Sequence, residues 1–189
     1  MDHAIASIFW RRLDRQGHDA CALWARPDGF ELAGSAVFEE AGRPCALTYR
    51  VDCDAGWATR RATVNGFVGT DPVEVAIVRD PTGGWTLNGV PQAAPRDCVD
   101  VDLGFTPATN LLVLRRFALD VGKERPAPAA YLAFPDLRLD RLEQHYRRSG
   151  EATYDYAAPV YDYAATLTVS PVGFVTDYPQ LWSAAEHAP

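Results

Sequence analysis

Two carboxylates spaced two residues apart are the residues of this 189-residue chain best suited to chemistry. Asp100 and Asp102 alternate with apolar residues, so a strand would place both carboxylates on one face, about 6.6 Å apart. Inverting glycosidases use carboxylates at similar separations. Catalytic carboxylates flank a bond from opposite sides, however, whereas neighbours on one strand project in parallel. We keep a hydrolase-type enzyme as the alternative and favour structural ion pairs between these aspartates and arginines, with Arg60, Arg61, Arg115 and Arg116 as the candidates.

The residues after these aspartates could bind an anionic headgroup. Thr106 followed by Pro107 is typical of a helix start, so we predict a short helix over 107–112. Its N-terminus, with Thr106, Thr109 and Asn110, would attract a phosphate or carboxylate, although capping alone also explains Thr106. We predict that an extended strand follows over 114–121. Arg115 and Arg116 would then point to opposite faces, so that at most one of them enters a cleft.

Other catalytic signals are weak. His18 beside Asp19 resembles an oriented base, but we favour a surface turn containing Gly17. The sequence contains no G-x-S-x-G, H-E-x-x-H, P-loop or dinucleotide-binding motif. Its four histidines and four cysteines have no metal-ligand spacing. We therefore predict no catalytic residue, no metal and no cofactor.

Composition narrows the class of protein. A chain of this length with 48% hydrophobic residues fits a single domain over 1–189. A net charge of −7 argues against nucleic-acid binding. The apolar run from Ala4 to Trp10 is too short for a transmembrane segment or a signal peptide. The cysteines lack C-x-x-C spacing, which favours reduced thiols. We expect a soluble, cytoplasmic protein.

The dominant hydrophobic period is two, which is typical of half-buried strands. Turn-forming residues recur at short intervals and favour a mainly β, antiparallel sheet with one or two short helices. The segment 135–148 could be helical or extended. We predict strands near 4–12, 19–26, 30–42, 45–53, 58–69, 73–79, 84–87, 98–103, 114–121, 128–134, 152–158, 163–170 and 172–176.

Several motifs together resemble a known family, the "putative glycolipid-binding" family. They are Trp10-Arg-Arg-Leu-Asp14, Gly34-Ser-Ala-Val-Phe38, Tyr49-Arg-Val-Asp-Cys-Asp54 with Trp57-Ala-Thr-Arg60, Asp100-Val-Asp-Leu-Gly-Phe-Thr-Pro-Ala-Thr-Asn110, and Tyr178-Pro-Gln-Leu-Trp182. The resemblance implies a strongly curved sheet that forms a half-open barrel, similar to bacterial lipoprotein carriers, with a cleft for a glycolipid or another acyl amphiphile. Those carriers work in the bacterial envelope, and the lack of an export signal here favours an intracellular amphiphile instead.

A curved sheet that its own side chains do not fill would leave a concave apolar surface for such a ligand. The tyrosines at 154, 156, 161 and 163 would add apolar faces with hydroxyl tips suited to sugars. For a single aromatic residue, core packing is the commoner role. The candidate ligand-binding set is Trp57, Arg60, Asp100, Asp102, Thr106, Asn110, Arg115, Arg116 and Tyr163. A protein-interaction module, which includes a homodimer, is the other alternative.

Overall fold

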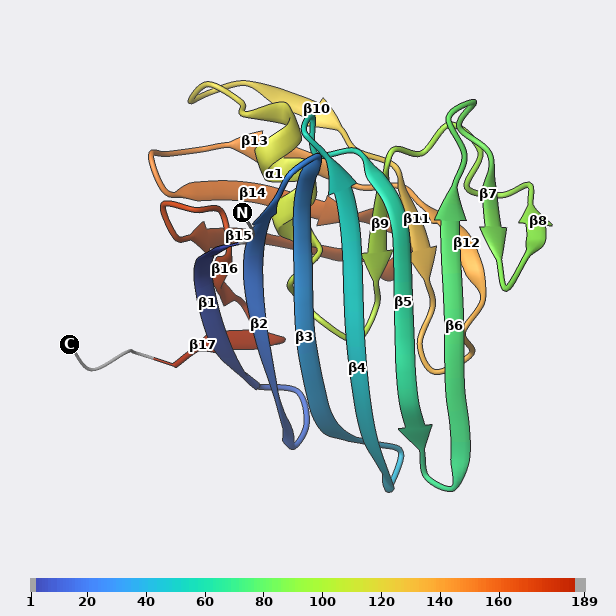
Figure 1. Ribbon diagram of the computed structural model, residues 1–189. Coiled ribbons are helices and arrows are strands. Elements are labelled where there is room, and N and C mark those ends of the chain that lie inside the picture. The colour runs from blue at the N-terminus through green and yellow to red at the C-terminus, as the bar shows by residue number, and fades with distance from the viewer. Residues whose placement is uncertain (1–2, 186–189) are drawn as a thin grey trace.

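The computed structural model describes residues 3–185, which form one large sheet and one small sheet (Figure 1). The large sheet has 14 strands in the order β10-β13-β14-β15-β16-β17-β1-β2-β3-β4-β5-β6-β7-β8, and every neighbouring pair is antiparallel. Because the outermost strands β10 and β8 do not pair with each other, the curved sheet stays open as a half-barrel. The mainly β, antiparallel fold that the sequence predicts is confirmed.

The first half of the large sheet consists of six long strands joined by tight turns: β1 (His3–Arg12), β2 (Gly17–Arg26), β3 (Gly29–Glu40), β4 (Arg43–Asp54), β5 (Thr59–Val68) and β6 (Asp71–Arg79). In β4 the buried residues Leu47, Tyr49 and Val51 alternate with the exposed residues Thr48 and Arg50. This alternation gives the wall a buried inner face and an outer face towards solvent.

Shorter strands complete the two sheets. The remaining members of the large sheet are β7 (Trp85–Leu87), β8 (Val90–Gln92), β10 (Glu124–Pro126), β13 (His145–Arg148), β14 (Thr153–Ala158), β15 (Tyr163–Val169), β16 (Val175–Tyr178) and β17 (Trp182–Ala184). The small sheet has the order β12-β11-β9, with β9 (Asp100–Leu103) parallel to β11 (Ala129–Leu132) and β12 (Leu139–Leu142) antiparallel to β11.

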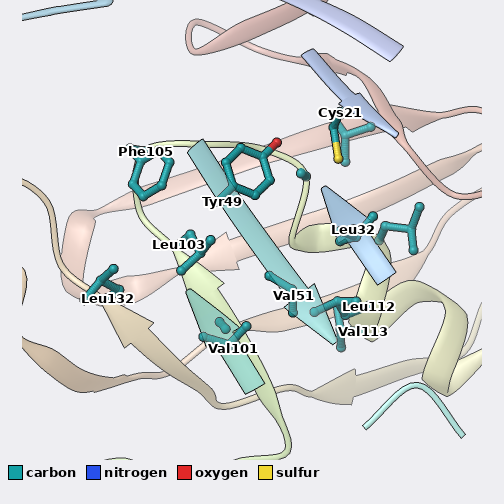
Figure 2. Packing of buried hydrophobic residues seen from close by; sticks show 14 of the residues in the cluster. Cys21, Leu32, Tyr49, Val51, Val101, Leu103, Phe105, Leu112, Val113 and Leu132 are labelled. Carbon is teal, nitrogen blue, oxygen red and sulfur yellow. The ribbon is translucent and has the colours of Figure 1, made fainter. Parts of the chain in front are cut away.

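The small sheet and helix α1 (Asn110–Phe117) lie behind the wall of long strands (Figure 1) and fill most of the hollow. Figure 2 shows Leu32 and Val51 of the wall in the same packed cluster as Val101, Leu103 and Phe105, and each of these five side chains is at most 1% exposed. The expectation of an unfilled apolar trough is therefore wrong. Burial of these side chains stabilises the fold, and a smaller recess remains at one end.

Helix α1 corrects two predictions. It begins at Asn110 rather than 107, and it continues to Phe117, so the predicted strand over 114–121 is wrong. The reason is tertiary: Leu111, Leu112 and Leu114 are all buried against the core, which a helix achieves and a strand would not. Ala118 then ends the helix in the left-handed conformation, with its N–H donating to the carbonyl of Leu114.

Several boundaries also differ from the prediction. The ambiguous segment 135–148 holds two strands, β12 and β13, and no helix. The strand predicted at 172–176 is instead β16, and β8, β10 and β17 were not predicted. Each of the three missed strands is three residues long, too short to show a hydrophobic period. A single-turn 3-10 helix, η1 (Pro159–Tyr161), joins β14 to β15.

Two general features concern the described residues. All four cysteines are free and buried. Within residues 3–185, no helix has the length and apolar character needed to span a bilayer.

Candidate functional site

A recess of about 360 Å³ opens beside the segment that links β9 to α1, and tyrosines form much of its wall. We call it the tyrosine pocket. Its lining combines aromatic rings with buried and charged polar groups, and includes Tyr131, Tyr156, Tyr161, Tyr163 and Tyr178, together with Asp102, Thr106 and Asn110, and with Arg12, Asp14 and Arg15. Four of the nine predicted ligand-binding residues, Asp102, Thr106, Asn110 and Tyr163, therefore meet in one recess.

Three neighbouring strands position a triangle of tyrosines. Tyr156 of β14, Tyr163 of β15 and Tyr178 of β16 have ring centroids 5.7 to 6.1 Å apart. The Tyr163 hydroxyl donates to the carbonyl of Pro179 at 2.7 Å, which fixes its ring. Burial raises the pKa of Tyr163 to about 12 and also raises the pKa values of Tyr156 and Tyr178. The phenols therefore stay protonated at neutral pH and can donate hydrogen bonds.

A second aromatic pair extends this wall. The rings of Tyr131 and Tyr161 meet edge to face at 6.0 Å. A Cβ atom at Gly104 would lie 2.6 Å from the Tyr131 hydroxyl, so only glycine at this position allows that hydroxyl to approach the turn after β9. Sequence reasoning had missed Tyr131 and Tyr178, because strand pairing and not sequence spacing brings them to the pocket.

Asp102 supplies a carboxylate whose hydrogen-bond donors in the described part of the chain are both neutral. The Thr109 hydroxyl donates to its Oδ1 at 3.0 Å, and the Gln144 amide donates to its Oδ2 at 2.6 Å. Gln144 also donates to the Tyr156 hydroxyl at 3.1 Å, which ties the carboxylate to the tyrosine wall. Burial raises the pKa of Asp102, although these two donors oppose the shift. Within residues 3–185, Asp102 is thus a fixed acceptor without a cationic partner.

The start of α1 is held by buried polar contacts. The Tyr146 hydroxyl donates to Oδ1 of Asn110 at 2.6 Å, and the Asn110 amide donates to the carbonyl of Pro107 at 3.0 Å. The Thr106 hydroxyl accepts the backbone N–H of Ala108 at 3.1 Å, as in a Ser/Thr turn. The N-cap of α1 is Thr109, which makes no side-chain cap hydrogen bond, so Thr106 accepts a backbone N–H as predicted but does not cap the helix.

Thr106 also donates a short hydrogen bond to Asp19, a residue that the sequence reasoning had misplaced. Asp19 lies within β2 and is 1% exposed, so the predicted surface turn around His18 and Asp19 is wrong. The Tyr49 hydroxyl approaches both carboxyl oxygens of Asp19 at 3.1 Å. Burial raises the pKa of Asp19 to about 7 against these hydrogen bonds. Asp19, Cys21 and Leu23 are spaced two residues apart and so share one face of the strand. This spacing is the signal that could have placed Asp19 on the buried face.

Arg12 forms the charged side of the pocket. Its guanidinium lies between the rings of Phe38 and Trp182, at 4.7 and 4.8 Å. Nε and Nη2 donate to the two carboxylate oxygens of Asp14 at 3.1 and 3.2 Å, which lowers the pKa of Asp14 although partial burial opposes this. Nη1 is buried without a hydrogen-bond partner among residues 3–185. Two rings and one carboxylate therefore fix this side chain.

Asp100 has a structural environment instead. Arg116 donates to it from Nε at 2.9 Å and from Nη2 at 2.5 Å, and Asp100 is only 4% exposed. The space that Asp100 and Asp102 both border measures about 10 Å³, too small for a substrate. The favoured pairing with an arginine is therefore found for Asp100 but not for Asp102. The pair of exposed carboxylates that a hydrolase would need is not present at this strand.

The other predicted site residues lie elsewhere. Arg60 forms an exposed ion pair with Asp28 at 2.5 Å. Trp57 and Arg115 stack on one another with 5.0 Å between guanidinium and ring, outside the tyrosine pocket. Arg116 pairs with an aspartate and Arg115 borders a groove, so the two arginines point in different directions as expected. They do so because they are neighbours on a helix, not on the predicted strand.

A larger hollow of about 590 Å³ lies on the outer face of β1 to β5. Small side chains such as Ala20, Ala33 and Ser35 line it, and its polar groups include Arg50 and Asn65. Among residues 3–185 its lining includes one buried phenol, that of Tyr49, but no carboxylate and no group of tyrosines, so it has fewer of the fixed polar groups typical of a small-molecule site. In the described part of the chain, no group of three or more potential metal-ligating side chains occurs.

The fold and the site together define the class of protein: an open antiparallel half-barrel that carries an aromatic and polar recess. The family described as "Putative glycolipid-binding" matches residues 7–184, and the chain belongs to that family. A crystal structure of a DUF1089 family protein from Pseudomonas aeruginosa is similar, with 28% identity and a TM-score of 0.77 over 87% of this chain and 91% of that one. No curated protein matches.

Proposed function

We propose that the tyrosine pocket binds the sugar headgroup of a glycolipid. The observation that carries this proposal is the triangle formed by Tyr156, Tyr163 and Tyr178 beside the Asp102 carboxylate. Sugar rings have apolar C–H faces that pack on aromatic rings, and their hydroxyls bind carboxylates, amides and phenols. The family description points to the same class of ligand.

The size of the pocket favours the headgroup over the whole lipid. Ligand sites usually occupy about 300–1,000 Å³, and this recess of about 360 Å³ lies near the lower limit. The acyl chains would then lie outside, next to exposed apolar side chains. Tyr161, which lines the pocket, is 56% exposed, and its neighbour Val160 is 72% exposed.

The first test is native mass spectrometry of the protein purified from its own host, followed by lipid extraction. The second is calorimetric titration with methyl glycosides and with octyl glycosides below their micelle concentration. Headgroup binding requires that methyl glycosides bind and that the alkyl chain adds affinity. If no amphiphile co-purifies and no glycoside of the panel binds, the proposal is wrong.

Variants locate the binding. Asp102→Asn removes the charged acceptor, and we expect glycoside affinity to fall about tenfold, which corresponds to about 1.4 kcal/mol. Tyr156→Phe removes one phenol from the pocket, and Tyr154→Phe is its matched control because Tyr154 lies on the same strand but outside the pocket. Equal losses in the two tyrosine variants would place the binding elsewhere.

A further inference from the structure

A stack of three side chains lies apart from the tyrosine pocket. The rings of Phe30 and Trp57 are nearly parallel, with an angle of 7° and 3.8 Å between centroids. The Arg115 guanidinium lies over the Trp57 ring, 5.0 Å from its centroid. This cation–π contact holds the guanidinium in one place before any ligand arrives.

The backbone at Trp57 is strained in order to place this ring. Trp57 has a φ of 69°, a left-handed conformation that a bulky residue rarely adopts. The turn is secured by Asp54, whose Oδ1 accepts the N–H groups of Gly56 and Ala58 at 2.8 and 2.9 Å. Such strain is concentrated at functional sites more often than at ordinary turns.

The stem of Arg115 is confined from the opposite side. Gly173 has a φ of 99°, and a Cβ atom there would lie 3.3 Å from Cδ of Arg115. Glycine thus allows both the turn and the close approach. Among residues 3–185, the Arg115 guanidinium has no hydrogen-bond or ion-pair partner, so its planar fork of donors remains available to a ligand.

A groove of about 550 Å³ has two arginines in its lining, Arg115 and Arg148. It lies between the end of α1 and the turns at 149–152 and 170–173. Arg148 donates to the carbonyls of Leu119 and Glu151 at 2.8 and 2.7 Å, and to that of Gly150 at 3.2 Å, but to no carboxylate of residues 3–185. Among these residues, Glu151 supplies the one carboxylate of the lining.

We propose that this groove, which we call the arginine groove, binds an oxyanion, the phosphate group of a small molecule, between Arg115 and Arg148. The lining includes two arginines and one glutamate, although the whole chain carries a net charge of −7. Planar guanidinium groups bind such oxyanions through paired hydrogen bonds. The three carbonyl contacts of Arg148 explain its position but leave its charge unneutralised. The site is independent of the tyrosine pocket and of the sugar proposal.

Inorganic phosphate is the first probe, titrated calorimetrically into the full chain at constant ionic strength. We expect saturable binding that falls at least tenfold in Arg115→Gln. The matched control is Arg125→Gln, which makes the same charge change at an arginine that also stacks on a ring, 5.4 Å from that of Phe117, but outside the groove. Arg125→Gln should bind phosphate like the parent protein.

A second variant guards against misfolding of the first. Arg115→Lys keeps the charge but loses the planar fork, so we expect an intermediate loss of phosphate affinity. Sedimentation with phosphatidylcholine vesicles, with and without phosphatidic acid, distinguishes a lipid phosphate from a soluble one. The proposal is overturned if the parent protein binds neither phosphate nor phosphatidic acid saturably, or if Arg125→Gln loses as much affinity as Arg115→Gln.

Discussion

Asp100 and Asp102 lie two residues apart on one strand, yet they occupy two different kinds of environment. Asp100 is bound by the Arg116 guanidinium and closed off from solvent, whereas Asp102 is bound by a hydroxyl and an amide and borders the tyrosine pocket. We call the Asp100–Arg116 pair sealed because the Asp100 side chain is only 5% exposed, although that of Arg116 is 20% exposed. Such a pair serves the fold, while a carboxylate held by neutral donors remains able to bind a ligand. Spacing alone does not distinguish the two roles; their partners on other elements do.

The largest effect should come from breaking the sealed pair. Arg116→Gln leaves Asp100 buried without its main cation, and we expect the free energy of unfolding at pH 8 to fall by about 3–5 kcal/mol. Urea denaturation measures this loss. Arg60→Gln is the control, because its pair with Asp28 is exposed and should contribute less than about 1 kcal/mol. Similar losses in the two variants would contradict the distinction between sealed and exposed pairs.

The buried carboxyl group of Asp19 extends the comparison, because its contribution to the free energy of unfolding should depend on pH. Burial raises its pKa from 3.8 to about 7. The unfolded chain therefore releases this proton at lower pH than the folded protein. The stability that Asp19 contributes is present below about pH 4 and is lost as pH rises through 7. We expect a loss of about 2–3 kcal/mol between pH 5 and pH 8 from this group.

Asp19→Asn should remove that loss, so the difference in unfolding free energy between variant and parent should change across this pH range. Urea denaturation at several pH values measures it. Asp28→Asn, which changes an exposed carboxylate, should run parallel to the parent protein. A parallel profile for Asp19→Asn as well would show that Asp19 does not titrate with a raised pKa.

The sequence predicted the long antiparallel strands well, because alternation within each strand is a local signal. The prediction of a strand over 114–121 was wrong because the apolar residues there fit both the strand period of two and the helix period of about 3.6. Only the burial of Leu111 and Leu112 against the core selects the helix. The pocket depends on contacts that no local pattern encodes. Thr106 and Asp19, for example, are 87 residues apart in sequence. The sequence could therefore indicate the part of the candidate site between Asp102 and Asn110, but not the residues that other strands bring to it, such as Tyr131 and Tyr178.

A smaller effect should separate two tyrosines on neighbouring strands. The Tyr163 hydroxyl donates to the Pro179 carbonyl, whereas Tyr154 has no hydroxyl hydrogen bond within the described residues. Tyr163→Phe should lower the unfolding free energy by about 1 kcal/mol, as a lost hydrogen bond does, and Tyr154→Phe should cost less. Thermal unfolding of both variants measures this. The reverse order would show that the Pro179 contact does not fix the pocket wall.

The smallest change in stability should come from Asp102→Asn, although it is expected to weaken sugar binding. Burial disfavours the carboxylate, so replacing it with a neutral amide removes a cost at pH 8. The new amide oxygen can still accept from Gln144, and its NH₂ can donate to the Thr109 hydroxyl oxygen. We therefore expect urea denaturation to show a change within about 1 kcal/mol of the parent protein. A loss as large as that of Arg116→Gln would mean that Asp102 supports the fold as Asp100 does, and the separation between a structural and a binding carboxylate would fail.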